Sequence, residues 1–441
     1  MAQPRVVITG IGQISPLGNT IDDVQAALVN GTSGVREFVN LPTTHLPMKF
    51  GAEAVDFTGD MSNFGELEKM TMRSIKKGQR LMSREIQMGV AAAQHAIASA
   101  GLSADVFDPD QIGVVFGSDY IMTVPAEYRE GVLNSRNEDG SFDFDQWGDG
   151  GLPKVNPLWL LKYLPNMPAS HIAIYNDLRG PSNSLTMREA SANLAIAEAF
   201  STIARGDSDI MVTGSTGTRI HPMRTLHVVT MEKVADDQWQ PAEASRPFQQ
   251  DSTGMVIGEG AGSLTIERLK FAQQRDVEIL GEIVGFASST VLSRDGNPGI
   301  QQAIENVMNQ ALAMGGISAA ELGHIHAHGI GMPAMDAEEA QGIRNVIGDA
   351  DIPVVAAKSY FGNLGAGSGT VETICSLLSM KSGTLFPTLN AGNTHENCPI
   401  NVVSTADVPA GECFINLNVT PQGQASSLLI RKYTPSRGIH L

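Results

Sequence analysis

The chain has 441 residues, of which 42% are hydrophobic and 17% are charged, a composition typical of a globular protein rather than a disordered or fibrous one. Its 30 basic and 47 acidic residues give a net charge of -17. This charge argues against nucleic acid as a main partner, because phosphate binding needs a basic surface. The length exceeds that of one ordinary core, so we expect two domains or a duplicated unit.

The spacing of the cysteines and the length of the apolar segments bear on where in the cell the protein is expected. Cys375, Cys398 and Cys413 have neither metal-site spacing nor the pattern of a disulfide framework, which favours a reducing environment. No apolar run approaches the ~20 residues needed to cross a bilayer. The first residues lead directly into a predicted strand, with no signal peptide before it. We therefore expect a cytoplasmic protein without a membrane span.

Strands and helices alternate in the first half of the chain. Strands are predicted at residues 6–9, 112–116 and 210–214. Helices are predicted at residues 21–29, with Thr20 as a possible cap, 84–100 and 189–204. The glycine-containing segment 255–266 is interpreted as a pair of strands. Residues 130–152 are acidic and weakly periodic, so we expect a surface insertion there, either a solvated loop or a partner contact.

The second half repeats the same alternation. Strands are predicted at residues 278–287, 325–327, 354–356, 413–419 and 427–432. Helices are predicted at residues 300–314, 336–346 and 370–381. Alternating strands and helices favour largely parallel sheets that are covered on both faces. Because the same order occurs twice, we expect an internal duplication.

The segment GPSNSLTMREA, residues 180–190, contains an unusual residue. A strand, a tight turn and a helix start together present a reactive side chain at a helix N-terminus. The helical spacing of apolar residues after this turn places Glu189 at that position. The pattern therefore offers a carboxylate where a nucleophile is expected.

A series of short motifs occurs in a fixed order along the chain. They are VVITGIGQISPLG near the start, GVVFGS at 113–118, RGPSNS at 179–184, ASRPF at 244–248, GMVIGEGAGSLTIE at 254–267, AHGIGMPAMDAEEA at 327–340, KSYFGNLGAGSGTVE at 358–372 and PTLN at 387–390. Over essentially the whole chain, this series resembles the β-ketoacyl-acyl-carrier-protein synthases of the elongating type. The resemblance implies a thiolase fold, an α/β fold with duplicated halves in a five-layered αβαβα sandwich. We place these halves at residues 1–267 and 268–441.

The resemblance also implies a catalytic set, which this chain retains only in part. In such enzymes a cysteine at a helix start takes the acyl chain from a carrier protein, and two histidines stabilise the enolate left by decarboxylation of a malonyl thioester. The cysteine position falls on Glu189, the first histidine on His328 and the second on Asn363. The supporting lysine and glutamate are retained as Lys358 and Glu372.

Other departures concern the arm that carries the substrate. Two threonines that would hold the phosphopantetheine arm are replaced by Ile330 and Met332, whereas Asp336 is retained. A glycine-rich gating loop of the family falls on VTPQ, residues 419–422. The resemblance implies no bound cofactor; the phosphopantetheine of a carrier protein would be a substrate arm.

Glu189 has three interpretations. It could be a nucleophile, a mimic of an acylated cysteine that supports malonyl decarboxylation, or an inert replacement. The cost of burying a charge favours the inert replacement. His328 with Asn363 could still promote decarboxylation. His324, His326 and His328 lie at alternate positions, which would suit a metal site, but we favour covered-strand histidines and predict no metal.

Two features bear on partners. The basic cluster of Arg73, Lys76, Lys77, Arg80 and Arg84 resembles the region where ketosynthases meet their acidic carrier protein, although a solvated face is an equal alternative. The resemblance implies a homodimer or heterodimer in which the strand before the nucleophile turn pairs across the two-fold axis, and we place this strand at residues 171–177.

Our leading hypothesis is a ketosynthase-family protein that has lost condensation and pairs with an active ketosynthase, as a chain-length factor does. The alternative is an enzyme: a malonyl-thioester decarboxylase or divergent acyltransferase that uses Glu189, His328 and Asn363. An ordinary condensing enzyme is contradicted by the missing cysteine.

Overall fold

The computed structural model describes residues 4–103 and 107–435. The strands are β1 (Val6–Ile14), β2 (Arg36–Glu37), β3 (Phe50–Gly51), β4 (Ile112–Gly117), β5 (Ser182–Leu185), β6 (Ile210–Thr218), β7 (Glu259–Arg268), β8 (Gly281–Thr290), β9 (His324–His326), β10 (Pro353–Val355), β11 (Asn401–Val402), β12 (Cys413–Val419) and β13 (Gln424–Arg431). The α-helices are α1 (Ile21–Asn30), α2 (Lys69–Gly78), α3 (Arg84–Ser99), α4 (Arg129–Leu133), α5 (Met167–Asn176), α6 (Ser191–Arg205), α7 (Pro222–Met231), α8 (Leu269–Gln274), α9 (Ile300–Gly315), α10 (Pro333–Ile347), α11 (Lys358–Phe361) and α12 (Ser368–Ser382).

Eleven strands form one mixed sheet in which a five-strand pattern occurs twice. Their order is β11-β10-β9-β12-β13-β8-β1-β7-β6-β4-β5. In the first half β7 is antiparallel to both β1 and β6, while β4 is parallel to β6 and β5. In the second half β13 is antiparallel to both β8 and β12, while β9 is parallel to β12 and β10. The predicted α/β fold with a duplicated strand order is thus confirmed.

The boundary between the halves, after residue 267, remains a prediction. The outermost residues of the two predicted halves, 1–3 and 436–441, lie outside the described part of the chain.

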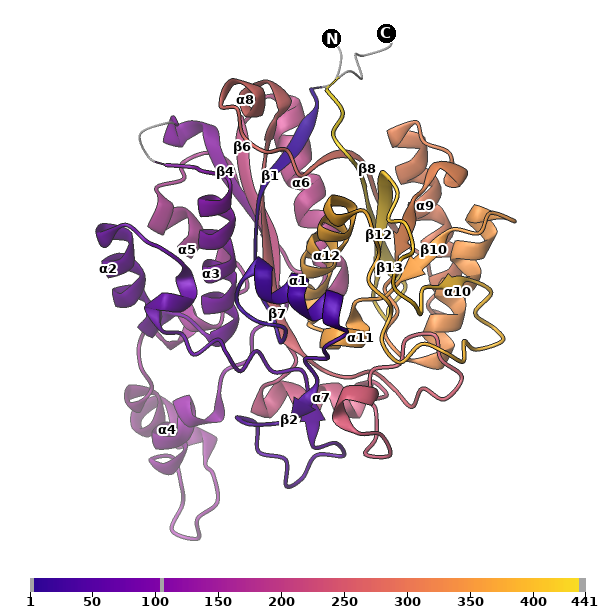
Figure 1. Ribbon diagram of the computed structural model, residues 1–441. Helices are drawn as coiled ribbons and strands as arrows, with labels where there is room; N and C mark the ends of the chain where they lie inside the picture. Colours follow the sequence, from indigo (N-terminus) through magenta and orange to yellow (C-terminus); the bar gives the residue numbers. More distant parts are fainter. Residues whose placement is uncertain (1–3, 104–106, 436–441) are drawn as a thin grey trace.

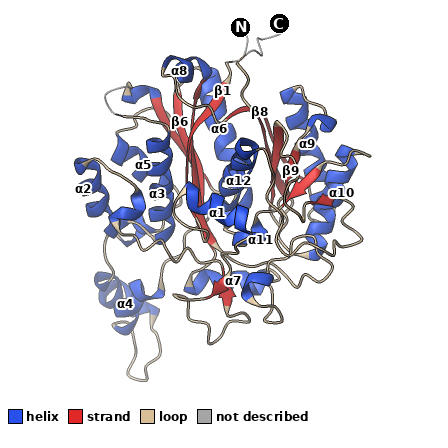
Figure 2. Cartoon of the chain, in the orientation of Figure 1, coloured by secondary structure: helices blue, strands red, loops and turns tan. Residues whose placement is uncertain are grey.

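The elements are stacked in five layers, visible from left to right in Figure 1. Helices α3 and α5 pack on the outer face of the first set of strands, and α9 and α10 form the outer layer of the second set. Helices α6 and α12 lie between the two sets and contact strands of both (Figure 2). Their side chains, among them Ile196 and Phe200 of α6 and Ile374 of α12, belong to one buried apolar cluster. This central layer brings the start of α6 close to the start of α12.

Local sequence signals explain the helix ends that were predicted well. The Thr20 side chain accepts a hydrogen bond from the Asp23 amide, and Asp23 accepts one from the Thr20 amide, which is a complete capping box at the start of α1. Gly206 ends α6 in the left-handed conformation at φ 92°, where glycine has no steric penalty. Such signals act within a few residues, so they can be recognised in the sequence alone.

Two predicted strands are wrong. Residues 171–176 of the predicted strand at 171–177 belong to helix α5, and Asp177 is the residue that ends it. Ile172 is buried and Ile174 is 70% exposed, although the two would share one face of a strand. The strand that precedes the nucleophile turn is instead β5, at the outer edge of the sheet. Residues 255–266 do not form a strand pair, because β7 runs unbroken from Glu259 between its neighbours β1 and β6. Helices α2 and α7 have no counterpart among the predicted elements.

The acidic segment 130–152 lies on the surface and contains short helical turns. The Trp147 ring contacts Tyr128 and Phe142 at centroid distances of 6.3 and 6.1 Å, while Phe144 is 75% exposed. Figure 1 shows this region, near α4, extending away from the layered body. Among the helices of the described residues, none has both the length and the apolar character needed to cross a membrane.

Candidate active site

The fold buries all five residues of the predicted catalytic set between the two halves. Glu189 lies in a 3-10 turn directly before α6, and His328 follows β9. Lys358 begins α11, Asn363 precedes α12 and Glu372 lies within α12. Each of the five is at most 1% exposed. The site therefore lies near the starts of α6 and α12, which meet in the central layer.

Lys358 fixes the position of His328. Its ammonium group lies 3.2 Å from His328 Nδ1, donates to the His328 carbonyl oxygen at 2.8 Å and forms an ion pair with Glu372. Glu372 in turn accepts from Asn418 Nδ2 at 2.7 Å. Because an ammonium donates, Nδ1 accepts and the imidazole proton is placed on Nε2. Lys358 and Glu372 are thus positioning residues for the imidazole.

His328 is held in its neutral form. Burial, followed by the positive charges of Lys358, Arg219 and Arg188, keeps the pKa of His328 well below its usual range. Its Nε2 atom is buried and has no hydrogen-bond partner among the described residues. This nitrogen could therefore donate to an oxyanion.

Two carboxylates order the backbone after His328. Glu339 accepts from the His328 amide at 2.6 Å and from the Gly329 amide at 2.9 Å. Asp336 accepts from the Ile330 and Gly331 amides, both at 3.0 Å. The Ile330 side chain is only 2% exposed and packs into an apolar cluster with Met332 at its margin. The loop keeps its backbone support, but apolar side chains stand where hydroxyl groups were expected.

Glu189 lies at the centre of a buried ionic network. Arg219 Nη2 forms an ion pair with Glu189 Oε1, Asn363 Nδ2 donates to the same oxygen at 3.2 Å, and Arg188 Nε lies 3.4 Å from Oε2. Glu232 Oε1 lies 3.5 Å from Arg219 Nη1 and also pairs with Arg188. The carboxylate is therefore neutralised by a guanidinium group that is itself only 1% exposed.

This network was not predicted from the sequence. Arg219 follows β6 directly and Glu232 follows α7, so neither lies in a recognised motif. The only available signal was a charged residue five positions after the predicted strand at 210–214. Burial lowers the pKa of Arg219 to about 10, although Glu232 and Asp119 act in the opposite direction.

A second buried ion pair adjoins the first. Arg224 pairs with Asp119 and lies 3.7 Å from Glu85. Burial alone would raise the pKa of Asp119, but Arg224, Arg219 and Arg188 together hold it below its usual value. Burial raises the pKa of Glu85 to about 8. The pKa values of the two carboxyl groups that face Arg224 are thus shifted in opposite directions.

Asn363 uses both ends of its amide. Nδ2 donates to Glu189 and faces Met255 Sδ at 3.6 Å, while Oδ1 accepts from the Gly365 amide at 3.0 Å and from Ser368 Oγ at 3.3 Å. The amide is therefore rigidly oriented toward the Glu189 carboxylate.

The segment at 419–422 is a tight turn between β12 and β13. Thr420 N donates to the Gln424 carbonyl oxygen at 2.8 Å, and Gly423 N donates to the Thr420 carbonyl oxygen at 3.0 Å. Arg188 Nη1 donates to Gln422 Oε1 at 3.3 Å. The turn is therefore tied to the residue that precedes Glu189.

The row of histidines has a structural explanation. His324 and His326 hydrogen-bond the Ser376 hydroxyl at 3.0 and 2.8 Å, and His324 Nδ1 donates to the Ala410 carbonyl oxygen at 2.8 Å. Among the described residues, no group of histidine, cysteine, aspartate and glutamate side chains could hold a metal ion.

The predicted basic cluster is divided in the structure. Arg73, Lys76, Lys77 and Arg80 are exposed on α2 and the turn after it. Arg84 is different, because it forms an ion pair with Glu259 at 2.7 Å and donates to two backbone carbonyl groups. Arg84 therefore differs from the other four, since β7 supplies a buried carboxylate that the sequence does not place beside α3.

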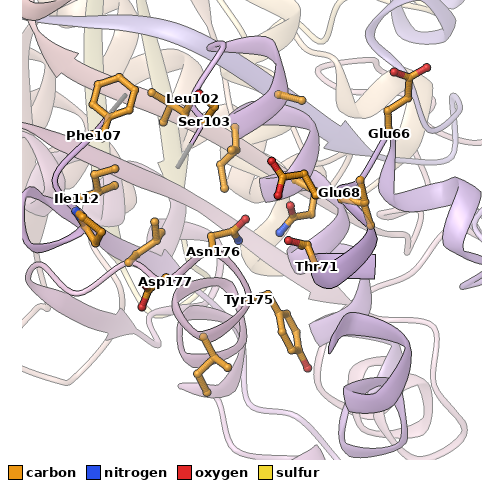
Figure 3. A pocket seen from close by; sticks show the side chains of 17 residues that line it. Glu66, Glu68, Thr71, Leu102, Ser103, Phe107, Ile112, Tyr175, Asn176 and Asp177 are labelled. Atoms are coloured by element: carbon orange, nitrogen blue, oxygen red, sulfur yellow. The ribbon is translucent and has the colours of Figure 1, made fainter. Parts of the chain in front are cut away.

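A cavity of about 320 Å³ lies away from this site, beside α2, α3 and α5 (Figure 3). Leu67, Phe107 and Tyr175 are among the residues that line it. None of the five predicted catalytic residues lines this cavity.

Comparison with known proteins agrees with this architecture. The β-ketoacyl synthase N-terminal domain matches residues 3–272, and the β-ketoacyl synthase C-terminal domain matches residues 280–392. The 3-oxoacyl-[acyl-carrier-protein] synthase 2 of Vibrio cholerae is 30% identical over 417 residues, which cover 91% of this chain and 92% of the relative. The corresponding protein of Coxiella burnetii is 29% identical over 406 residues, with the same coverage.

Solved structures give the same result. A β-ketoacyl synthase from Burkholderia phymatum has a TM-score of 0.83 at 26% identity, covering 98% of this chain and 100% of that one. The ishigamide ketosynthase/chain length factor has a TM-score of 0.82 at 25% identity, with the same coverage. The chain therefore belongs to the β-ketoacyl synthase family of fatty-acid and polyketide synthesis.

Proposed function

We propose that this chain does not catalyse condensation and instead pairs with an active, cysteine-bearing ketosynthase, as a chain-length factor does. The observation that carries this proposal is the buried Glu189–Arg219 ion pair at the position of the family's nucleophile. A carboxylate would have to store the acyl chain as a mixed anhydride, which is a poor store beside a thioester. Pairing with a guanidinium group weakens its nucleophilic character further.

The other site features support the same proposal. Asn363 is bound to Glu189 rather than open to a substrate, and Ile330 and Met332 offer no hydroxyl group to a phosphopantetheine arm. The three cysteines are buried at positions other than the helix start. The family's nucleophile, its second histidine and its arm-binding threonines are therefore all replaced in this chain. The Lys358–Glu372 ion pair and the hydrogen bond from the Ile330 amide to Asp336 are present.

A partner subunit is proposed from the exposed edge of the sheet. Among the described residues, strand β5 is the last strand of the sheet and pairs with β4 alone, so its other edge has no strand partner there. Folded proteins avoid such an edge by pairing or covering it. Ile174 on the neighbouring α5 is 70% exposed. A dimer with an interface above ~2,000 Å² would cover both; the related ishigamide protein combines a ketosynthase with a chain length factor.

We further propose that α2 contacts an acyl carrier protein. In a chain with a net charge of -17, this helix and its following turn expose five cations, and no ion pair within the described residues engages them. The cations are Lys69 and the four proposed to contact the carrier protein: Arg73, Lys76, Lys77 and Arg80. An acidic carrier protein would be attracted to this face, and its phosphopantetheine would enter as a substrate arm rather than as a bound cofactor.

The cytoplasmic location of the protein also remains a prediction.

No covalent acyl-enzyme is expected. After incubation with an acyl carrier protein or an acyl thioester, intact-mass spectrometry should show the unmodified chain, because no thiol lies at the start of α6. A cysteine-bearing family member run in parallel is the positive control. A stable adduct mapped to Glu189 would contradict the proposal.

Malonyl-thioester decarboxylation is the second candidate function, and one observation favours it. His328 is neutral and its Nε2 atom lacks a partner among the described residues, as an enolate-stabilising donor requires. The incubation above, repeated with a malonyl thioester, distinguishes the two functions. Release of carbon dioxide that His328→Ala abolishes would favour the decarboxylase; no release favours the non-catalytic partner.

A dimer is expected in solution, and a heterodimer is expected when a cysteine-bearing ketosynthase from the same organism is present. Light scattering on the pure protein and on the mixture, followed by mass spectrometry of the co-purified partner, measures both. A well-behaved monomer would overturn the dimer proposal. A homodimer that binds none of these ketosynthases would favour the decarboxylase.

A further inference from the structure

Three polar groups from separate segments converge on one carboxylate. Arg219 Nη2 and Asn363 Nδ2 both contact Glu189 Oε1, the amide at 3.2 Å, and Arg188 Nε lies 3.4 Å from Oε2. Arg219 comes from the end of β6 and Asn363 from the loop before α12. Both lie within the protein, each 1% exposed. This arrangement of guanidinium and amide donors is that of a carboxylate-binding site.

The donors are held by contacts that do not involve Glu189. Arg219 Nη1 lies 3.5 Å from Glu232 Oε1, and Arg188 pairs with Glu232 and donates to Gln422. Asn363 Oδ1 is fixed by Ser368 and by a backbone amide. Loss of the Glu189 carboxylate would therefore leave its donors near their present positions, with a buried guanidinium group facing an empty space.

We propose that Arg188, Arg219 and Asn363 form a binding site for small carboxylates, which Glu189 fills as an internal ligand. In the native chain the site is closed to free carboxylates because its own side chain occupies it. The proposal goes beyond the assignment of a partner subunit, since it concerns the chemistry of the pocket whichever partner the chain has.

The size of the space left by Glu189→Ala determines which small carboxylate can test the proposal. Replacement of glutamate by alanine removes one methylene group and one carboxylate, and these are the atoms of acetate apart from one hydrogen. Arg188 reaches from the site to the surface, because its Nε atom lies 3.4 Å from Glu189 Oε2 while its side chain is 26% exposed and contacts Gln422. Acetate is therefore expected to enter Glu189→Ala and to restore the missing charge.

The test is thermal unfolding of the full-length Glu189→Ala variant in increasing sodium acetate at constant ionic strength, with chloride as the balancing anion. The variant should melt below wild type in chloride, and acetate should raise its Tm by several degrees in a saturable manner, as binding to the folded state requires. Acetamide, a neutral molecule of the same shape, should have little effect. Nuclear magnetic resonance with carbon-13 acetate should report the bound ion directly.

Three variants serve as controls. Glu189→Gln fills the space without a charge and should not respond to acetate. Glu189→Ala/Arg219→Met lacks the main donor and should also fail to respond. Glu198→Ala removes a carboxylate from α6, the helix that follows Glu189, and should behave as wild type toward acetate. Glu198 pairs with Arg205 at 3.5 Å on the surface, where the two side chains are 38% and 54% exposed.

The proposal fails if acetate raises the Tm of Glu189→Ala no more than it raises that of wild type, or no more than acetamide does. If Glu189→Ala does not fold in chloride, its refolding yield from urea is measured in acetate. Recovery that increases with acetate concentration supports the site. Absence of recovery at every concentration, while Glu189→Ala/Arg219→Met refolds, overturns it.

Discussion

Glu189→Cys is expected to remain inactive in condensation and to be less stable than wild type. The substitution places a thiol at the helix start, but it removes the carboxylate that neutralises Arg219. Removing one partner of a buried ion pair costs about 3–5 kcal/mol, because the other charge stays uncompensated in the interior. Arg219 is 1% exposed, so solvent screens its uncompensated charge poorly.

The thiol would also lack the groups with which the family's cysteine acts. Asn363 stands in place of the second histidine, and removing a single oxyanion donor costs ~10²–10³ in rate. Ile330 and Met332 offer no hydroxyl group to the substrate arm. Groups that act as a unit are strongly non-additive, so one restored member gives little activity.

Chain elongation from acyl and malonyl carrier proteins, followed by mass spectrometry, measures this outcome, and urea unfolding at fixed protein concentration measures the stability. Glu189→Ser is the matched control, since it makes the same space without a thiol. Elongation by Glu189→Cys above the level of Glu189→Ser would show that the other departures matter less than we expect.

Lys358→Met is expected to lower the free energy of unfolding by about 3–5 kcal/mol. The substitution leaves Glu372 buried, with Asn418 as its remaining hydrogen-bond donor among the described residues. It also removes the hydrogen bond that Lys358 donates to the His328 carbonyl oxygen. Burial already raises the pKa of Glu372 against the opposing charge of Lys358. Without that charge the carboxyl group would become still harder to ionise.

A double-mutant cycle separates the pair from its surroundings. Lys358→Met/Glu372→Met removes both charges and should recover most of the loss, because apolar residues of similar volume can replace a buried ion pair. Lys381→Met breaks a surface pair with Glu278, where both side chains are more than half exposed, and should cost less than about 1 kcal/mol. If Lys358→Met lowered the free energy of unfolding no more than Lys381→Met does, the buried ion pair would not stabilise the position of His328 as the geometry indicates.

The sequence by itself determined the fold class and the candidate residues of the site. Helical and strand periodicity, the Thr20 cap and the glycine at the end of α6 are local signals, and they act through contacts within a few residues. The ordered motifs identified Glu189, His328 and Asn363 as members of one candidate site. Their burial together confirms that these motifs meet between the two halves.

Only the tertiary structure decided which charges accompany them. Arg219 lies 30 residues from Glu189 in the sequence, and the two meet because β6 and the turn before α6 end at the same place. Similarly, Arg84 pairs with Glu259 of β7, and residues 171–176 belong to a helix although their pattern also fits a strand. A buried ion pair requires both partners to be excluded from water at one point, and that depends on packing between distant segments. No periodicity or local spacing records it.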